Sequence, residues 1–366
     1  MRRFVLFLAL LATVGTASAQ RLPDRHDLWV PARLPEQLWQ PVLPDTDTVS
    51  IFIVGDIMSH RAVSKSAETY GFSSFFRHIE DRIAGADLAI GNLEFPLAGK
   101  PYTGYPQFSG PDAYARYLKE TGFDVFLTAN NHITDKGAAG MSRTLSVLDT
   151  LGVAYTGTAA SPEADTLLNP LLLHVRGLRI AIVNFTYGTN TGTGTPWPKV
   201  HTMNKEQVAR MLERAQEADI VLVFPHWGIE YRHRHSEEQE QWARFVVDHG
   251  ADAVIGAHPH VVQDIRRIGH APVFYSVGNA LSNQNDLDAR LELAVTLRIA
   301  VSPFHPPQML EPAWEFLWCT KPGMVEESYS AVPVTLSAEY WRDASDYDNM
   351  IHTLEKVQQI LHEEND

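Results

Sequence analysis

Residues 125–132 read VFLTANNH, an apolar run that stops at two asparagines and a histidine. Four further apolar runs also end in residues that can bind metal: FIVGD at 52–56, LAIGNLE at 88–94, VLVFPHWG at 221–228 and AVIGAHPH at 253–260. Short apolar runs that alternate with helical patterns are typical of an α/β architecture. In an open α/β sheet the loops after the carboxyl ends of the strands line the active-site crevice. We therefore expect the five ends to converge.

The composition limits which ligands such a site can use. The chain has 366 residues, 45% of them hydrophobic, enough for a full-sized core in one large domain or two. Thirty Lys and Arg stand against 44 Asp and Glu, and this net charge of −14 argues against nucleic acid as a partner. Sixteen histidines and a single cysteine, Cys319, exclude zinc ribbons and CxxC redox chemistry. Any metal must therefore be held by nitrogen and oxygen.

The residue types at the five ends suit a divalent transition metal. Imidazole, carboxylate and amide groups together favour Mn, Fe or Zn over calcium, which prefers oxygen alone. His258 and His260 are two residues apart, so in an extended segment both rings would face the same side. The sequence therefore predicts one shared metal site, with one or two ions, at the strand ends.

The first nineteen residues have the pattern of a secretory signal peptide. Arg2 and Arg3 precede an apolar run, and Ala17-Ser18-Ala19 provides a small-residue cleavage site. The apolar run is too short to predict a membrane span, and no cysteine follows Ala19 to carry a lipid. We therefore expect an exported protein, periplasmic or secreted and without a transmembrane anchor, whose mature chain starts near Gln20.

The rest of the chain divides into three parts. Residues 20–47 are rich in Pro and Leu but show no periodicity, which indicates an extended lead-in. Residues 48–335 contain the strand ends and form the predicted domain, in which Ser73–Gly85 is expected to be a helix. Residues 336–366 form a C-terminal helical extension that should pack on the domain through an amphipathic helix at Asp346–Glu363.

Six motifs follow one another along the chain: GDIM (55–58), GNLE (91–94), ANNHITDKG (129–137), HWGIEY (226–231), GAHPHVVQ (256–263) and YSVGN (275–279). In this order they resemble the CapA family of poly-γ-glutamate capsule-synthesis proteins, a branch of the calcineurin-like metallophosphoesterase superfamily. The resemblance covers about residues 48–335. It implies an α/β fold, a four-layer α-β-β-α sandwich of the metallo-dependent phosphatase type, with a metal centre at the strand ends.

The resemblance also implies roles for individual residues. The implied metal ligands are Asp56, Glu94, Asn131, His226, His258 and His260. His132 resembles the histidine that protonates a leaving group. The chain departs from the superfamily twice: Met58 stands where the first motif, DxH, has its histidine, and the nearest imidazole is His60. In addition, Ile133 follows His132 where an acid is usual, and Asp135 comes two residues later.

The chemistry that these parts suggest is metal-assisted hydrolysis. His132, oriented by Asp135, would act as the general acid. Glu230 would be a general base or a partner of a ligand imidazole, with a surface carboxylate as the equal alternative. Asn279 is expected to be a turn residue rather than a partner of the site. Residues on a turn-rich loop that would line the substrate cleft, unless the tyrosines simply pack, are Tyr102, Tyr105 and Gln107.

Two functions remain open at this point. The first is a metal-dependent hydrolase of capsule or cell-envelope polymer metabolism, which cleaves a phosphoester or polymer bond in a polymer or a small molecule. The second is a non-catalytic factor that binds poly-γ-glutamate or assists capsule assembly. The acidic chain would repel a polyanion in general, so such a substrate needs local basic contacts. The candidate cations near the motifs are Arg232, Arg234, Lys100 and Lys136.

Overall fold

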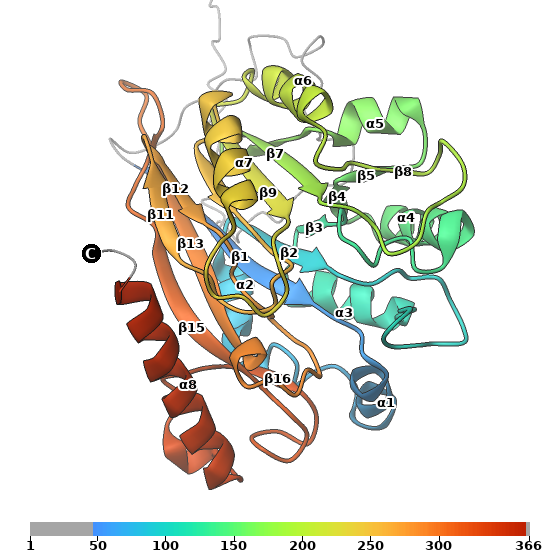
Figure 1. Cartoon of the computed structure of the whole chain (residues 1–366), viewed down its shortest axis with the longest axis vertical. Helices are drawn as coiled ribbons and strands as arrows, with labels where there is room; N and C mark the ends of the chain where they lie inside the picture. The colour runs from blue at the N-terminus through green and yellow to red at the C-terminus, as the bar shows by residue number, and fades with distance from the viewer. Residues whose placement is uncertain (1–46, 364–366) are drawn as a thin grey trace, which may run out of the picture.

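The chain folds around two β-sheets (Figure 1), which a computed structural model describes for residues 47–363. The larger sheet contains β1 (Asp47–Ile57), β2 (Leu88–Leu93), β3 (Val125–Leu127), β4 (Ala154–Thr156), β13 (Leu291–Val301), β14 (Gln308–Met309), β15 (Ala313–Thr320) and β16 (Ser330–Pro333). Its order is β16-β15-β13-β1-β2-β3-β4, and β14 pairs with β13. Because β1, β2 and β3 run parallel, their carboxyl ends lie at the same end of the sheet.

The smaller sheet has a parallel centre with an antiparallel strand at each edge. It contains β6 (Leu171–Val175), β7 (Leu178–Thr186), β9 (Ile220–His226), β10 (Ala253–Ile255), β11 (Ile265–Ile268) and β12 (Ala271–Phe274). Its order is β11-β12-β10-β9-β7-β6, with β7, β9, β10 and β12 parallel to their neighbours in this group. A separate pair joins β5 (Thr158–Ala159) to β8 (Lys199–Val200).

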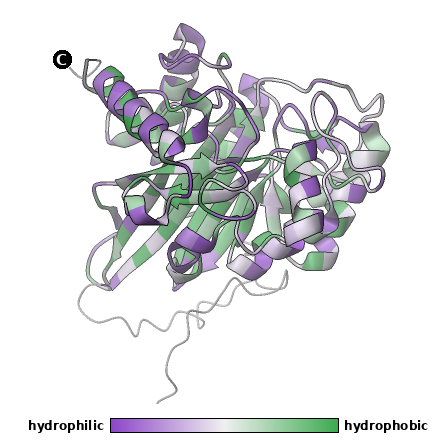
Figure 2. Cartoon of the chain, turned by 90° about the horizontal axis from the view of Figure 1, so that it is seen from below, coloured by the Kyte–Doolittle hydropathy of each residue, from purple (hydrophilic) through white to green (hydrophobic). Residues whose placement is uncertain are grey.

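Helices lie in the connections between the strands and, as α8, after the last strand. They are α1 (Arg61–Tyr70), α2 (Glu80–Gly85), α3 (Asp112–Thr121), α4 (Gly137–Leu151), α5 (Pro162–Leu168), α6 (Lys205–Ala215), α7 (Glu237–Asp248) and α8 (Ala344–Glu363). Short 3-10 helices are η4 (Arg77–Ile79), η5 (Asp288–Arg290) and η6 (Ala338–Tyr340). In Figure 2 the hydrophobic colour gathers on the strands inside the molecule, while the helices carry hydrophilic residues on their outer faces.

Strand β7 shows how the sheets are layered. Ile180 and Ile182 belong to a core cluster that includes Ile53 of the larger sheet. The alternate residues Ala181 and Val183 belong to a second cluster with the inward faces of α6 and α7. Successive side chains of a strand point to opposite faces, so one face of the smaller sheet packs on the larger sheet and the other on helices. Buried side chains of α2, α3 and α4 pack on the larger sheet: Ile83, Leu118 and Leu145. The predicted four-layer α-β-β-α sandwich is confirmed.

Helix α8 is tied to the larger sheet by a buried ion pair. Arg290 Nη1 and Nη2 donate to Asp346 Oδ1 and Oδ2 at 2.6 and 2.7 Å. Trp318 Nε1 of β15 donates to the same carboxylate at 3.1 Å, and the Arg290 guanidinium lies 4.4 Å from the centre of the Trp318 ring. Met350 and Val357 add buried apolar contacts along the helix. Asp346 is therefore the polar anchor of α8.

The helix expected at Ser73–Gly85 is wrong in its first part. Helical structure begins only at Arg77, with η4, and continues as α2. Ser74 Oγ donates to the carbonyl of Tyr329, and the N–H of Phe76 donates to Tyr117 Oη. Contacts with distant parts of the chain thus replace the local hydrogen bonds that would have begun the helix earlier.

Two expectations concern residues at the amino terminus. The signal peptide at residues 1–19 and the lead-in at 20–47 lie outside the described residues, except for Asp47, which begins β1. Among residues 47–363, no helix combines the length and the apolar composition that a membrane crossing requires.

Replacing the anchor of α8 should destabilise the fold. In Asp346→Ala the buried Arg290 loses its charged partner, and we expect a loss of about 3 kcal/mol in the free energy of unfolding, measured by urea denaturation. The matched control is Asp348→Ala, an exposed aspartate on the same helix, which should change the free energy by less than about 0.5 kcal/mol. Equal unfolding midpoints for the two variants would contradict the anchoring role.

Candidate metal centre

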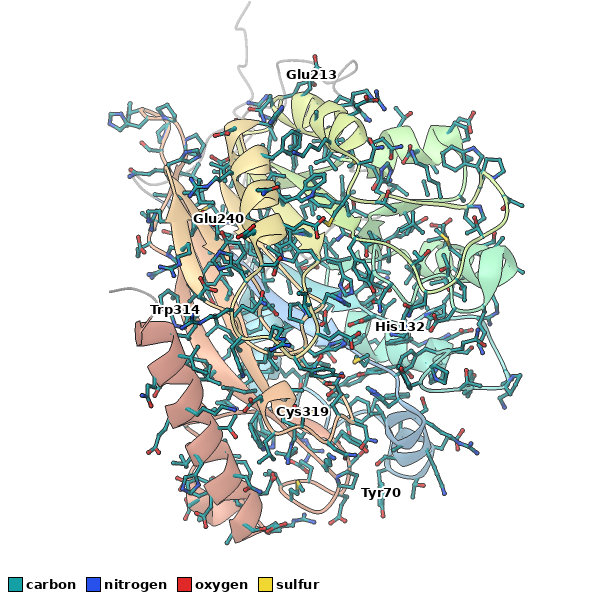
Figure 3. The ribbon with its side chains drawn as sticks, viewed as in Figure 1. Tyr70, His132, Glu213, Glu240, Trp314 and Cys319 are labelled. Atoms are coloured by element: carbon teal, nitrogen blue, oxygen red, sulfur yellow. The ribbon has the colours of Figure 1, made fainter. Side chains whose placement is uncertain are left out.

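The ends of β1, β2 and β9 meet the loops after β3 and β10, and Figure 3 marks His132, on the loop after β3, near the middle of the molecule. Two groups of buried side chains there place their ligand atoms within 4.8 Å of one another. The groups are Glu94, His226 and His258, and Asp56, Glu94 and His260. Because Glu94 belongs to both groups, the five residues form one cluster, which we call the metal-ligand cluster.

Asp56 lies at the centre of this cluster's hydrogen bonds. Its Oδ1 accepts from Asn92 Nδ2 at 2.6 Å, and its Oδ2 lies 3.1 Å from His260 Nδ1. The residue before Asp56 has to be glycine, because a Cβ at position 55 would lie 2.0 Å from the carbonyl oxygen of Gly278. Burial alone would raise the pKa of Asp56, but the hydrogen bonds and the nearby imidazoles outweigh it and lower the pKa to about 2. Asp56 is therefore ionised at neutral pH.

Glu94 stands directly after β2 and is fully buried. Within the described part of the chain, neither of its carboxylate oxygens has a hydrogen-bond partner. Oε1 lies 3.6 Å from His226 Nε2. Burial and the charge of Asp56 raise the pKa of Glu94 well above its usual value. A second carboxylate beside an ionised one, without donors of its own, is the arrangement that a bound cation would stabilise.

His226 ends β9 and lies between two asparagines. Its Nε2 is 2.9 Å from Asn131 Oδ1, and its Nδ1 is 3.2 Å from Asn92 Nδ2. Burial lowers the pKa of His226 to about 3, so the ring is neutral at physiological pH. A neutral imidazole is the form that binds metal ions.

His258 and His260 do not lie on an extended segment, so that part of the prediction is wrong. Strand β10 ends at Ile255, and the two histidines have φ values of 98° and 60°. Left-handed backbone costs about 1–2 kcal/mol for a residue with a side chain, and such strain gathers at functional sites. Here it brings the N–H of His258 within 3.3 Å of Asp56 Oδ2. His258 Nδ1 is buried and has no hydrogen-bond partner among residues 47–363.

His132 and Asp135 lie beside the metal-ligand cluster and contact each other. His132 Nδ1 is 2.7 Å from Asp135 Oδ2, and both side chains are buried. The same carboxylate oxygen accepts the N–H of Phe108 at 2.8 Å, and Asn190 Nδ2 lies 3.2 Å from His132 Nδ1. The Phe108 ring packs edge-on against His132, with ring centres 4.6 Å apart. The imidazole is therefore held in one orientation.

Other candidates lie outside the metal-ligand cluster. His60 Nδ1 accepts the N–H of Asn283 at 3.2 Å, and its ring packs edge-on against Phe108. It belongs to neither metal-binding group, so it does not replace the missing histidine of the first motif. Glu230 is exposed in the turn after β9, although its charge contributes to the raised pKa of Glu94. Glu230 thus lies at the solvent-exposed rim of the site. Among the described residues, no hydrogen bond joins its side chain to a ligand imidazole. The three loop residues that were expected to meet substrate line one cavity: Tyr102, Tyr105 and Gln107.

Asparagines complete the site, and two of them were not predicted to do so. Asn279 Oδ1 lies 2.9 Å from His260 Nδ1, so Asn279 is a partner of the site and not merely a turn residue. Asn190 also donates its N–H to the carbonyl of Asn131 at 2.8 Å. A signal for Asn190 existed, because it follows the apolar run of β7 as the other polar residues follow theirs.

The donor set fits a divalent cation. Two carboxylates and three imidazoles converge, and Glu94 and His258 carry buried acceptor atoms without donors among the described residues. Nitrogen and oxygen ligands of this kind suit Mn, Fe or Zn. Because Glu94 belongs to both groups, the donor set is compatible with one ion or with two.

Comparisons with known proteins found a matching family and several similar relatives. Residues 50–284 match the family described as bacterial capsule synthesis protein PGA_cap. The chain is 31% identical over 253 residues to the capsule biosynthesis protein CapA of Bacillus anthracis, covering 66% of this chain and 61% of that protein. It is 33% identical over 252 residues to the PGA biosynthesis protein CapA of Bacillus subtilis, covering 65% and 64%. The chain thus spans less than two thirds of these relatives.

Among solved structures, the chain is similar to the NAD nucleotidase of Haemophilus influenzae, with a TM-score of 0.42 at 11% identity. That similarity covers 86% of this chain and 61% of the nucleotidase.

Metal binding should stabilise the wild-type protein. At a free Mn²⁺ concentration 100 times the dissociation constant, we expect the free energy of unfolding to rise by about 2.7 kcal/mol over protein in EDTA. Glu94→Gln and His258→Ala should lose most of this gain, because each removes an atom of the metal-ligand cluster. Metal-free Glu94→Gln should fold at least as stably as wild type, since it removes a carboxylate that burial disfavours.

The control for this measurement is His60→Gln, which should retain the gain because His60 lies outside both groups. Urea denaturation with and without Mn²⁺ gives the metal-dependent gain in the free energy of unfolding for the wild type and for each of the three variants. A full metal-dependent gain in Glu94→Gln and His258→Ala would contradict the site.

His60 should also make the stability of the metal-free protein depend on pH. Burial and nearby imidazoles lower its pKa from 6.5 to about 3 in the folded protein, whereas in the unfolded chain it takes up a proton near pH 6.5. The free energy of unfolding is therefore highest above pH 6.5 and falls as the pH is lowered. The proton taken up by His60 on unfolding accounts for a loss of about 2 kcal/mol at pH 5. Between pH 7.5 and 5 in EDTA, the free energy of unfolding of His60→Gln should therefore fall by about 2 kcal/mol less than that of the wild-type protein. His352→Gln, an exposed histidine on α8, should behave like wild type.

Proposed function

This chain belongs to the bacterial capsule synthesis family PGA_cap, and from that premise we propose that it is an exported, metal-dependent hydrolase of capsule or cell-envelope polymer metabolism. The observation that carries the proposal is the buried metal-ligand cluster beside the oriented pair His132 and Asp135. The pair supplies an oriented imidazole next to the cluster, which is what general acid catalysis requires. The signal-peptide pattern of residues 1–19 supports export.

The metal would be held by Asp56, Glu94, His226, His258 and His260, with Asn131 beside His226. When bound, a divalent cation supplies Lewis acidity toward a substrate oxygen and a water whose pKa is lowered to about 7. The ionised Asp56 and the neutral His226 are already in the protonation states that metal binding requires. Glu94, whose pKa is raised by burial and by the charge of Asp56, is the exception, because metal binding favours its ionised form.

His132 would protonate the leaving group of the substrate. Its Nδ1 is engaged by Asp135 Oδ2, which leaves Nε2 to carry the transferable proton. Asp135 also stabilises the imidazolium that precedes the transfer, and Phe108 and Asn190 keep the ring in place. Glu230, exposed at the rim, would act on the substrate through its charge and not as a base inside the metal-ligand cluster.

The division of roles can be tested with two histidine variants. His132→Ala should lower the turnover number by about 10²- to 10⁴-fold and retain the metal content of wild type. His258→Ala should lose both metal and turnover, because it removes a ligand. Asp135→Asn should lower turnover with metal retained and alter its pH profile, since Asp135 acts through His132. Elemental analysis and assays on bis-aryl phosphodiesters, phosphomonoesters and γ-glutamyl polymer provide the readouts.

Two outcomes would contradict these assignments. Equal loss of metal in His132→Ala and His258→Ala would refute the separate roles. Absence of hydrolysis with Mn, Fe, Zn and Co, while polymer binding persists, would show a non-catalytic assembly factor instead.

A further inference from the structure

Two half-exposed tyrosines lie against ligand histidines of the metal-ligand cluster. Tyr187 directly follows β7, and its ring packs on that of His258 with the ring centres 4.5 Å apart. Tyr231, in the turn after β9, has its ring centre 6.0 Å from that of His260. The two histidines are at most 4% exposed, whereas Tyr187 is 45% exposed and Tyr231 is 46% exposed. These two residues, which we call the tyrosine pair, therefore lie between the two histidines and the solvent.

Backbone contacts fix the position of the tyrosine pair. The N–H of Tyr187 donates to the carbonyl of His226 at 2.8 Å, and the N–H of Tyr231 donates to the carbonyl of Pro259 at 2.8 Å. Tyr231 has a φ of 62°, a left-handed conformation that is unfavourable for a residue with a bulky side chain. Such conformations persist where the surrounding structure imposes them, and they gather at active sites and ligand-binding sites.

The hydroxyl groups of the tyrosine pair are uncharged at neutral pH. Burial and the charges of Glu230 and Asp286 raise the pKa of Tyr231 to about 12. Burial and the charges of Glu230 and Glu94 raise the pKa of Tyr187. Because Glu230 acts on both hydroxyl groups, this exposed carboxylate lies near both tyrosines. The pair therefore offers neutral rings and hydroxyl donors beside carboxylates.

These surroundings favour one kind of substrate group. An apolar ring can pack edge-on or offset on the exposed tyrosine rings, and this contact removes apolar surface from water. Ile229, exposed in the same turn as Tyr231, adds to that surface. A ring that itself carried a negative charge would be repelled by Glu230 and Asp286. The group that fits best is therefore an uncharged ring.

We propose that Tyr187 and Tyr231 bind an uncharged ring of the substrate, next to the group that the metal-ligand cluster holds, and so determine which substrates the site accepts. This inference rests on the proposed function for the group held at the metal, but the binding of a ring can be measured without turnover. The ring faces of the tyrosines supply the contact, and their hydroxyl groups donate to oxygen atoms of the substrate.

The test compares the binding of phenylphosphonate and methylphosphonate to the full-length, Mn²⁺-loaded protein by isothermal titration calorimetry. Neither molecule contains a phosphoester bond, so the measurement does not depend on turnover. Wild type should bind phenylphosphonate about tenfold more tightly than methylphosphonate, since contacts with two aromatic rings add to the affinity.

Three variants separate the rings from the hydroxyl groups and from the rest of the surface. Tyr187→Ala/Tyr231→Ala should lose the preference for phenylphosphonate, whereas Tyr187→Phe/Tyr231→Phe should keep it because both rings remain. The matched control is Tyr340→Ala, which removes an exposed tyrosine on η6 and should bind both phosphonates as wild type does. Elemental analysis should give the same metal content for all of these proteins, because neither tyrosine is a metal ligand.

Three results would overturn the proposal. If wild type shows no preference for phenylphosphonate, or binds neither phosphonate, no ring is bound. If Tyr187→Ala/Tyr231→Ala weakens the binding of both phosphonates equally, the tyrosines only support the ligand histidines. If 2-aminoethylphosphonate binds more tightly than phenylphosphonate, the carboxylates near the pair select a cation instead.

Two further comparisons keep the result decisive. If Tyr187→Ala/Tyr231→Ala does not fold, Tyr187→Ala alone should lose part of the preference. A ring preference that depends on the tyrosine pair, in a protein that hydrolyses none of the assayed substrates, would uphold this inference and reject the proposed function. Hydrolysis without a ring preference would uphold the proposed function and reject this inference.

Discussion

The burial of two carboxylates between the sheets is the constraint on which the rest of the structure depends. Asp56 is ionised because His260 and Asn92 hydrogen-bond to it, and Glu94 beside it has no such donors in the described chain. Unpaired buried charge is costly, so either the surrounding elements supply donors or a cation, or the carboxyl group retains its proton more strongly, as the raised pKa of Glu94 indicates. The strained backbone of the two histidines after β10 is explained by the same need, because it directs an N–H and a ring toward Asp56.

The buried side chain of Asn184 holds the part of the site on the larger sheet in place relative to the part on the smaller sheet. Asn184 of β7 accepts the N–H groups of Thr128 and Ala129 at 3.1 and 2.8 Å. Its Nδ2 donates to the carbonyl of Phe224 in β9 at 2.7 Å. One side chain of the smaller sheet therefore fixes the loop that carries His132 relative to the strand that ends in His226. A metal site divided between two sheets needs such a link, since small shifts between the layers would separate its ligands.

The metal-ligand cluster and the cavity at the start of α1 have different surroundings. The metal-ligand cluster is buried and built from imidazoles and carboxylates, whereas the cavity at the start of α1 is lined by the cationic side chains of Arg61, Lys65 and Lys136. Phe108 lies between them and contacts His132 on one side and His60 on the other.

The sequence by itself determined the α/β class, the positions of the strand ends and the donor types of the site. These features are local, because strand periodicity and residue chemistry can be read within a few positions, as at LAIGNLE and VFLTANNH. Only the tertiary structure decided the left-handed backbone at His258 and His260, the contacts of Asn190 and Asn279, and the place of Glu230 at the rim. Each of these depends on groups far away in the chain, whose positions are set by the packing of two sheets and not by neighbouring residues.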